Sequence, residues 1–350
     1  MSHTEIDISP RAEELHARAI VINALCSSNS TPKKADAEFG LPEIMNDGGV
    51  TAVNLTISVK DDFKTTIATF THLLNAIDRR ADDVRLARTA ADIRAAKAAG
   101  VPAIVAGFQN SDPFDGNLAY VSLFARLGLR ISQLTYQRRN LAADGTGEEA
   151  DAGLSVFGRS LVQELNKERI LIDLSHTGER SSLETIELSS APVAVTHACL
   201  QSFNPVRRNK TDETIKAMAA RGGVFGMNAI ARLISPNGNA EGATVEQFVD
   251  QIDYLADMVG IDHVGLGLDI NEGLTPEGFA ERRKGFLTEF PELRMGGDFP
   301  FEHYYAFGLT SMRNMRAITE TLVRRGYSDE DVLKVLGGNF LRLFEEVWGA

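Results

Sequence analysis

Residues 170–198 read ILIDLSHTGERSSLETIELSSAPVAVTHA, and this stretch contains the repeating unit of the expected fold. Two short apolar runs, at 170–175 and 192–196, flank a longer amphipathic stretch at 180–189. Short apolar runs indicate buried strands, and apolar residues at helical spacing indicate a helix that covers the sheet. The segment therefore predicts one strand–helix–strand unit of a parallel sheet.

The same unit recurs along the whole chain. Eight runs rich in Val, Ile and Leu have the character of strands, and they cover residues 19–24, 50–56, 101–108, 128–136, 170–175, 192–196, 223–228 and 263–269. Eight consecutive units with no linker between them favour one α/β domain over residues 1–350, a (β/α)₈ TIM barrel. Six or seven true strands would instead form an open, doubly wound sheet, and this alternative stays open at this point.

Amphipathic stretches between the strands predict helices at 65–81, 153–168, 180–189, 212–221 and 245–258. Thr211 stands in the capping position of the fourth, and Thr244 with Gln247 has the spacing of a capping box at the fifth. A Gly-, Pro- and charge-rich segment predicts a long loop at 271–300 after the eighth strand. Extra C-terminal helices are expected within 310–350, near 310–325 and 328–347.

Charge and composition exclude several classes of protein. The formal net charge is −12, and no large cluster of Lys or Arg offers the basic face that nucleic acids require. No stretch approaches the roughly 18 apolar residues of a membrane-spanning helix, and the polar first 19 residues lack the apolar segment of a secretory signal. We therefore expect a cytoplasmic protein that binds neither nucleic acid nor membrane.

Polar side chains gather at the ends of the predicted strands. They are Asn23, Asn54, Gln109, Thr135, Tyr136, Asp173, His176, His197, Asn228 and Asp269. The working residues of a (β/α)₈ barrel lie at the carboxyl ends of its strands. The arrangement predicts a small-molecule site at that end of the barrel.

His176 and His197 are the strongest candidates for metal binding. They are 21 residues apart, about one strand–helix unit, and should project from neighbouring strands toward one pocket. Two imidazoles placed in this way suit a divalent transition metal, with zinc as the default. The alternative is that both make ordinary hydrogen bonds at the rim.

Three further residues have chemistry that suits this site. Asp269 ends the eighth strand, where a carboxylate can ligate a metal or take a proton from water, although it could also cap a loop. Asp173 could orient His176 or serve only as a structural hydrogen-bond acceptor. Arg208 follows the sixth strand, where its planar guanidinium could hold a substrate carboxylate.

These segments together resemble the membrane (renal) dipeptidase family of zinc-dependent barrel peptidases. The resemblance covers nearly the whole chain and rests on the blocks IDLSHTGERSSLETI (172–186), PVAVTHA (192–198), RRNKTDETIKAMAARGGVFGMN (207–228), IDHVGLGLDIN (261–271) and VLKVLGGNFLRLFEEV (332–347). It implies a barrel of the metallo-dependent hydrolase type that cleaves dipeptides. It also implies that His176 and His197 bind one zinc of a pair, that Arg208 holds the substrate carboxylate, and that Asp269 serves the metals and the reacting water.

The chain departs from the family pattern at the other metal. VINALCS (21–27) has Leu25 and Ser27 where the family has a His-x-Asp pair. Gln109 aligns with the bridging glutamate, and Tyr136 with a substrate-polarising histidine. Leucine cannot bind a metal, and serine and neutral glutamine are poor ligands, so one zinc is expected rather than two. Asn23, Gln109 and Tyr136 keep hydrogen-bonding groups and are predicted to contact the substrate.

The leading interpretation is therefore a metal-dependent hydrolase that cleaves a dipeptide or a related small amide with a free carboxylate. One alternative is a lyase or isomerase on the same scaffold that uses Tyr136, Asp269 or Cys26. Another is a binding protein without catalytic activity.

Cys26 and Cys199 are expected to be free thiols. The resemblance suggests a homodimer; the apolar C-terminal residues could form its interface or could instead cap the barrel floor.

Overall fold

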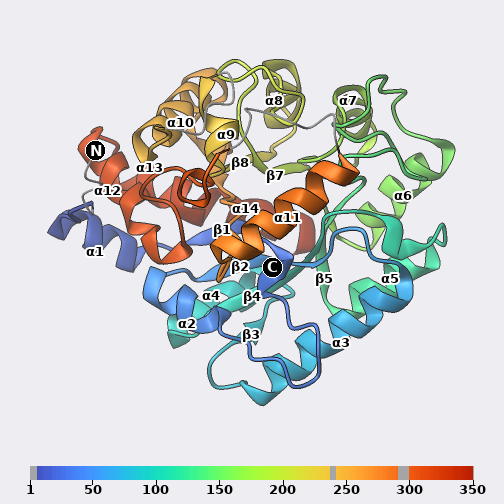
Figure 1. The fold of residues 1–350 in the computed structure, drawn as a ribbon, viewed down its shortest axis with the longest axis horizontal. Coiled ribbons are helices and arrows are strands. Elements are labelled where there is room, and N and C mark those ends of the chain that lie inside the picture. The colour runs from blue at the N-terminus through green and yellow to red at the C-terminus, as the bar shows by residue number, and fades with distance from the viewer. Residues whose placement is uncertain (1–5, 237–241, 291–298, 350) are drawn as a thin grey trace.

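The computed structural model describes residues 6–236, 242–290 and 299–349. Eight parallel strands follow one another around a barrel in the order β1-β2-β4-β5-β6-β7-β8-β9 (Figure 1). They are β1 (Ile22–Cys26), β2 (Ala52–Ser58), β4 (Ala103–Phe108), β5 (Leu129–Gln133), β6 (Leu171–Asp173), β7 (Ala194–Ala198), β8 (Val224–Met227) and β9 (Val264–Leu266). Each of the eight predicted strands corresponds to one of them. The expected (β/α)₈ fold is confirmed.

The barrel closes between its first and last strands. Cys26 and Ile270 form an isolated parallel bridge just beyond β9. The main-chain amide of Asp269 donates to the carbonyl of Leu25 at 3.2 Å, and that of Ser27 donates to the carbonyl of Ile270 at 3.3 Å. These bonds join the two ends of the sheet, so the open, doubly wound alternative is wrong. A two-residue strand, β3 (Arg85–Leu86), adds to the start of β4.

Helices surround the barrel where the sequence predicts them. Their bounds are α1 (Pro10–Arg18), α2 (Leu41–Gly48), α3 (Phe63–Arg79), α4 (Ala90–Ala99), α5 (Ala119–Leu127), α6 (Val156–Lys167), α7 (Glu179–Leu188), α8 (Asp212–Ala219), α9 (Ala231–Ile234), α10 (Val245–Val259), α11 (Pro276–Glu289), α12 (Arg316–Arg324), α13 (Asp329–Leu333) and α14 (Asn339–Trp348). Thr211 caps α8, and Thr244 and Gln247 form both bonds of a capping box at α10. Both predicted caps are confirmed.

The segment 271–300 is not the continuous loop that its composition predicts. Residues 276–289 form α11, which Thr275 caps by accepting a hydrogen bond from the amide of Gly278. Phe279 is the only buried residue of this helix, so α11 lacks the apolar stripe from which a helix is recognised. Residues 291–298 lie outside the described part of the chain.

The C-terminal helix α14 closes the floor of the barrel. Its Phe340, Phe344 and Trp348 pack against apolar side chains of the strands, among them Ile22 and Val105. The indole of Trp348 also donates to the carbonyl of Arg130 at 3.1 Å. The apolar C-terminal residues Leu341, Leu343, Phe344, Val347 and Trp348 are all buried, so within one chain they cap the floor.

The second predicted C-terminal helix, 328–347, is interrupted. α13 ends at Leu333, a π-helical turn follows at Lys334–Gly338, and α14 begins at Asn339. A Cβ at Gly337 would lie 2.2 Å from the carbonyl oxygen of Ile20, so the break lets the chain pass close to the entry of β1. No helix in the three described ranges is both long enough and apolar enough to span a membrane.

Candidate active site

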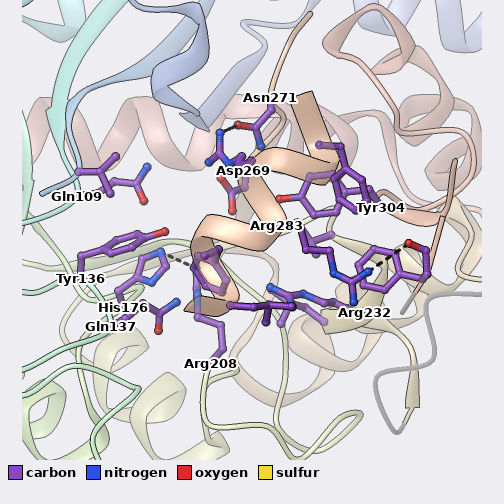
Figure 2. A pocket seen from close by; sticks show the side chains of 18 residues that line it. Gln109, Tyr136, Gln137, His176, Arg208, Arg232, Asp269, Asn271, Arg283 and Tyr304 are labelled. Carbon is purple, nitrogen blue, oxygen red and sulfur yellow. Dashed lines mark hydrogen bonds between the residues drawn. The ribbon is translucent and has the colours of Figure 1, made fainter. Parts of the chain in front are cut away.

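A cavity with about 90 Å³ open to the centre of a water-sized sphere lies at the carboxyl ends of the strands (Figure 2). One part of its wall comes from the barrel, including Gln109, Tyr136, His176, Arg208 and Asp269. Another part comes from α11, which contributes Phe279, Arg282, Arg283, Phe286 and Leu287. The predicted position of the site agrees with this cavity, and α11 covers it.

His176 and His197 meet at the base of this region. Their Nε2 atoms lie 3.1 Å apart, and both side chains are buried. Burial, and then the nearby cation of Arg208, lower the pKa of both histidines well below the usual value. Both imidazoles are therefore neutral at physiological pH, which is the form that binds metals.

A buried carboxylate sets the orientation of His197. The hydroxyl of Thr196 donates to Asp173 Oδ2 at 2.6 Å, and His197 Nδ1 lies 2.7 Å from the same hydroxyl oxygen. Because Thr196 gives its one proton to the carboxylate, His197 must donate from Nδ1, and its Nε2 then carries a lone pair. Asp173 thus orients His197, through Thr196, instead of His176 as the sequence suggested.

Arg208 is held rigidly beside the histidines. Its Nη1 donates to the carbonyl of Ser175 at 2.8 Å, and its Nη2 donates to the carbonyl of His197 at 2.7 Å. Nη2 also donates to His176 Nε2 at 3.2 Å. The side chain is buried and lines the cavity, so the predicted carboxylate-binding residue is placed where a small ligand can reach it.

The donor set can be tested against the zinc ion that the resemblance implies. Nε2 atoms 3.1 Å apart suit two ligands of one ion, since zinc binds nitrogen at about 2.0–2.1 Å. Catalytic zinc normally has three protein ligands, however, and the described residues contain no group of three His, Cys, Asp or Glu side chains that could hold a metal. The guanidinium of Arg208 also donates to the lone pair of His176. These residues therefore do not fit a catalytic zinc site, and zinc binding by the two histidines stays a prediction.

Asp269 combines an unusual backbone with an unusual charge environment. Its φ is +57°, in the left-handed region that non-glycine residues seldom adopt. Asn228 donates to its Oδ2 at 3.3 Å. Burial raises the pKa of Asp269, and the cations of Arg208 and Arg282 oppose this shift. A strained residue with a raised pKa that borders a cavity has the properties of a proton-transfer group.

Tyr136 and Gln109, which are predicted to contact the substrate, also line the cavity. The Tyr136 ring lies 4.3 Å from the His176 ring between centroids. Burial raises the pKa of Tyr136 to about 12, so its hydroxyl stays protonated and can donate a hydrogen bond. Gln109 Nε2 donates to Thr56 Oγ1 at 2.9 Å, which fixes the amide at the cavity wall.

Asn23 does not contact the cavity, and its predicted role in substrate binding is corrected. The side chain is fully buried, and its Oδ1 accepts from the amide of Leu268 at 2.9 Å. The expected strand 19–24 was placed too early, because β1 runs from Ile22 to Cys26. Asn23 is therefore the second residue of the strand, inside the barrel, where it links β1 to the segment after β9.

The two cysteines have no place in the cavity wall. Both are free and buried, and neither is among the residues that line the cavity. Burial raises the pKa of each thiol to about 12, so neither is a thiolate at neutral pH. The structure gives no support to a covalent role for Cys26.

Several residues of the cavity wall are not predicted from the sequence. Arg232 lies on α9, five residues beyond β8, where the rule on strand ends could have found it. Arg282 and Arg283 lie on α11, in the segment that was predicted to be a loop. Aromatic side chains at 279, 286, 299 and 304 complete this part of the wall. A helix without an apolar stripe gave no signal that it covers a site.

Comparison with known proteins gives a consistent result. The family model described as membrane dipeptidase (Peptidase family M19) matches residues 11–285 and 292–349. Dipeptidase verJ of Clonostachys rogersoniana is 29% identical over 275 residues, which are 78% of this chain and 68% of that protein. For dipeptidase tcpJ of Claviceps purpurea the identity is 27%, and the matched part is 76% of this chain and 56% of that protein.

Solved structures are similar over almost the full chain. An amidohydrolase from Pseudomonas aeruginosa is 34% identical with a TM-score of 0.86, and the match covers 97% of this chain and 99% of that one. A metallo peptidase from Rhodobacter sphaeroides, solved with a phosphinate mimic of the dipeptide L-Ala-D-Ala, shares the fold at 21% identity and a TM-score of 0.78. That match covers 94% of this chain and 100% of the other.

Proposed function

The chain belongs to the membrane dipeptidase family, and on this premise we propose that it is a hydrolase for a dipeptide or a related small amide with a free carboxylate. One observation carries the proposal: the buried guanidinium of Arg208 lines the cavity, and its three hydrogen bonds go to two main-chain carbonyls and a neutral imidazole. No carboxylate of the described chain forms an ion pair with it. A substrate carboxylate would supply that missing negative charge.

In the proposed reaction, Asp269 moves the proton. As a carboxylate it takes a proton from water while the water oxygen attacks the amide carbon, and it then gives that proton to the nitrogen that leaves. The protonated hydroxyl of Tyr136 donates to the carbonyl oxygen as negative charge develops there. This sequence uses only side chains that line the cavity, and no step depends on a metal.

Substrates that differ only at the carboxylate test the role of Arg208. We expect turnover of dipeptides or N-acyl amino acids and much slower turnover of the same compounds as C-terminal amides. Arg208→Gln should lower kcat/KM for the acids by about tenfold to a hundredfold, since a charge-assisted hydrogen bond contributes about 1.5–3 kcal/mol. Equal rates for acids and amides would contradict the proposal.

Zinc is a separable part of the proposal. Binding by His176 and His197 predicts about one zinc per chain after incubation with zinc, as measured by elemental analysis, and its loss in His176→Ala. Almost no bound zinc, together with unchanged turnover in the presence of a chelator, would contradict zinc binding. The proposed reaction of Asp269 and Tyr136 would still stand.

The incomplete donor set also favours a second candidate, a lyase or isomerase that uses Asp269 and Tyr136 as acid and base. Product analysis separates the two, because only hydrolysis releases a new amine and a new carboxylate. Binding of small carboxylates without turnover of any of them would instead indicate a binding protein. The cytoplasmic location and the homodimer stay predictions, which fractionation of cells and light scattering can check.

A further inference from the structure

The cavity is cationic although the whole chain is acidic. Among the described residues, four arginines line it, at positions 208, 232, 282 and 283, and Asp269 is the only lining carboxylate. The chain as a whole has a formal net charge of −12. A positive pocket in a negative protein favours anionic ligands over neutral or zwitterionic ones.

Arg232 is partly buried and lacks hydrogen-bond and ion-pair partners among the described residues. Its Nε is buried and has no hydrogen-bond partner. Within the described residues its guanidinium forms neither a hydrogen bond nor an ion pair, and it lies over the Phe286 ring, with Cζ 5.9 Å from the ring centroid. Burial, together with the nearby cation of Arg283, lowers the pKa of Arg232. An uncompensated charge of this kind is costly, so an acceptor from a ligand would stabilise it.

No carboxylate in the part of the chain that the structure describes forms an ion pair with Arg282, so this residue adds positive charge. It lies on α11 and donates to Asn271 Oδ1 and to Asn29 Oδ1, the latter at 3.0 Å. Its contacts with Ser27 Oγ are longer, at 3.4 and 3.5 Å. All three partners are neutral, so they orient Arg282 and leave its charge in place.

Arg208 and Arg232 occupy different parts of the cavity. Arg208 reaches His176, next to Tyr136, whereas Arg232 lies away from these two rings, beside Arg283 (Figure 2). Apolar side chains of Ile230, Leu233 and Phe286 line the same cavity. A ligand that meets both cations therefore needs two separated anionic groups joined by a largely apolar chain.

We propose that Arg232 forms a second anion-binding subsite, so that the cavity takes a dianionic ligand with one carboxylate at Arg208 and another at Arg232. The position of the first carboxylate rests on the proposed function; the second subsite is new to it. We therefore expect the amide substrate to have a second acidic group and a blocked amino end, because Asp269 is the only carboxylate among the described lining residues that could pair with an ammonium.

Calorimetric titration with unbranched dicarboxylates, from succinate to suberate, tests the subsite by binding alone. Each is compared with the monocarboxylate of the same chain length. At one or more lengths the dicarboxylate should bind about tenfold tighter or more, as expected for an added charge-assisted contact. Arg232→Gln should abolish this advantage while changing monocarboxylate affinity by no more than about twofold.

Two further variants make the result specific. Arg232→Lys keeps the charge and should keep part of the advantage, and melting curves show whether each variant folds. Arg126→Gln removes an exposed arginine on α5 and should change neither affinity. The proposal is overturned if no dicarboxylate binds, if none binds more tightly than its monocarboxylate, or if the advantage survives in folded Arg232→Gln. The titrations measure binding alone, so they can be interpreted even if the protein hydrolyses no amide. The second subsite and the proposed hydrolase function can therefore fail separately.

Discussion

Asp269 holds a left-handed backbone conformation that costs free energy, and it is the one carboxylate among the described residues of the cavity wall. Asp269→Asn keeps the size of the side chain and removes its ability to take a proton. We expect kcat to fall by about a hundredfold or more, because proton transfer by a placed side chain contributes at least that much to many reactions. Steady-state kinetics on the best substrate, alongside a melting curve, measures this.

Asp115 supplies a matched control for Asp269. It also has a positive φ, +49°, but it is exposed in a loop outside the cavity. Asp115→Asn should leave kcat unchanged. Full turnover in Asp269→Asn would show that another group moves the proton.

The positions of single residues at the cavity were predictable where the end of the strand was located correctly, and the roles of these residues stay predictions. His176, Arg208 and Asp269 follow or end well-marked apolar runs, and the structure brings them to one region. The predicted position of Asn23 at the rim was wrong, because an error of two or three residues in the bounds of β1 moves a side chain from the rim into the barrel. Arg232 was missed because an arginine in a loop is usually solvated, and only packing shows that its Nε is buried.

At the scale of elements, β7 and the residue after β9 approach each other closely. A Cβ at Gly267 would be 1.7 Å from the carbonyl oxygen of Thr196. Gly267→Ala must therefore separate the two strands, and we expect a loss of about 3 kcal/mol or more in the free energy of unfolding. Urea denaturation followed by circular dichroism gives this value.

Gly285, on α11, is the corresponding control. Nothing lies within 4 Å of a Cβ at this position, and the residue is in a helix. Gly285→Ala should be neutral or should stabilise the protein by about 0.5–1 kcal/mol, because alanine favours the helix. Equal effects of the two substitutions would mean that the contact at Gly267 does not constrain the barrel.

Elements were predictable in proportion to the regularity of their apolar pattern. The barrel strands are buried along almost their whole length, and every one was found. α11 was missed because Phe279 is its only buried residue, so the helix leaves no periodic apolar pattern in the sequence. The break in the last helix depends on how closely Gly337 approaches Ile20, a contact between distant parts of the chain that local patterns do not reveal.

For the whole molecule, His16 connects the N-terminal helix to the C-terminal part of the chain. Its Nε2 lies 2.9 Å from the carbonyl oxygen of Gly48, and its Nδ1 lies 2.7 Å from Thr319 Oγ1. Burial lowers the pKa of His16 to about 4, from an ordinary value of 6.5. Between these two values the unfolded chain binds a proton that the folded chain does not, so stability is retained above pH 6.5 and falls as the pH decreases toward 4.

Urea denaturation at pH 7 and pH 5 measures this linkage. His16 should account for a loss of about 2 kcal/mol between the two, and in His16→Gln the loss should be smaller by that amount. The comparison of slopes matters, because His176 and His197 also have lowered pKa values and remain in both proteins. Identical slopes in the two proteins would contradict the assignment.

The architecture as a whole was the most predictable feature. A count of eight apolar runs without a linker is insensitive to errors of a few residues at each boundary, so the barrel emerged although β1 was misplaced. Closure of the ring at Cys26 and Ile270 and the cover provided by α11 both depend on contacts between residues far apart in the sequence. They could be recognised only in three dimensions.

The barrel and the helix that covers its cavity come from different segments of the sequence. Residues 276–289 form much of the wall over the cavity but none of the strands of the ring. Substitutions in this short segment can change ligand preference and leave the contacts between the barrel strands intact. Evolution, or an engineer, thus has a part of the gene in which specificity can diversify at little risk to folding.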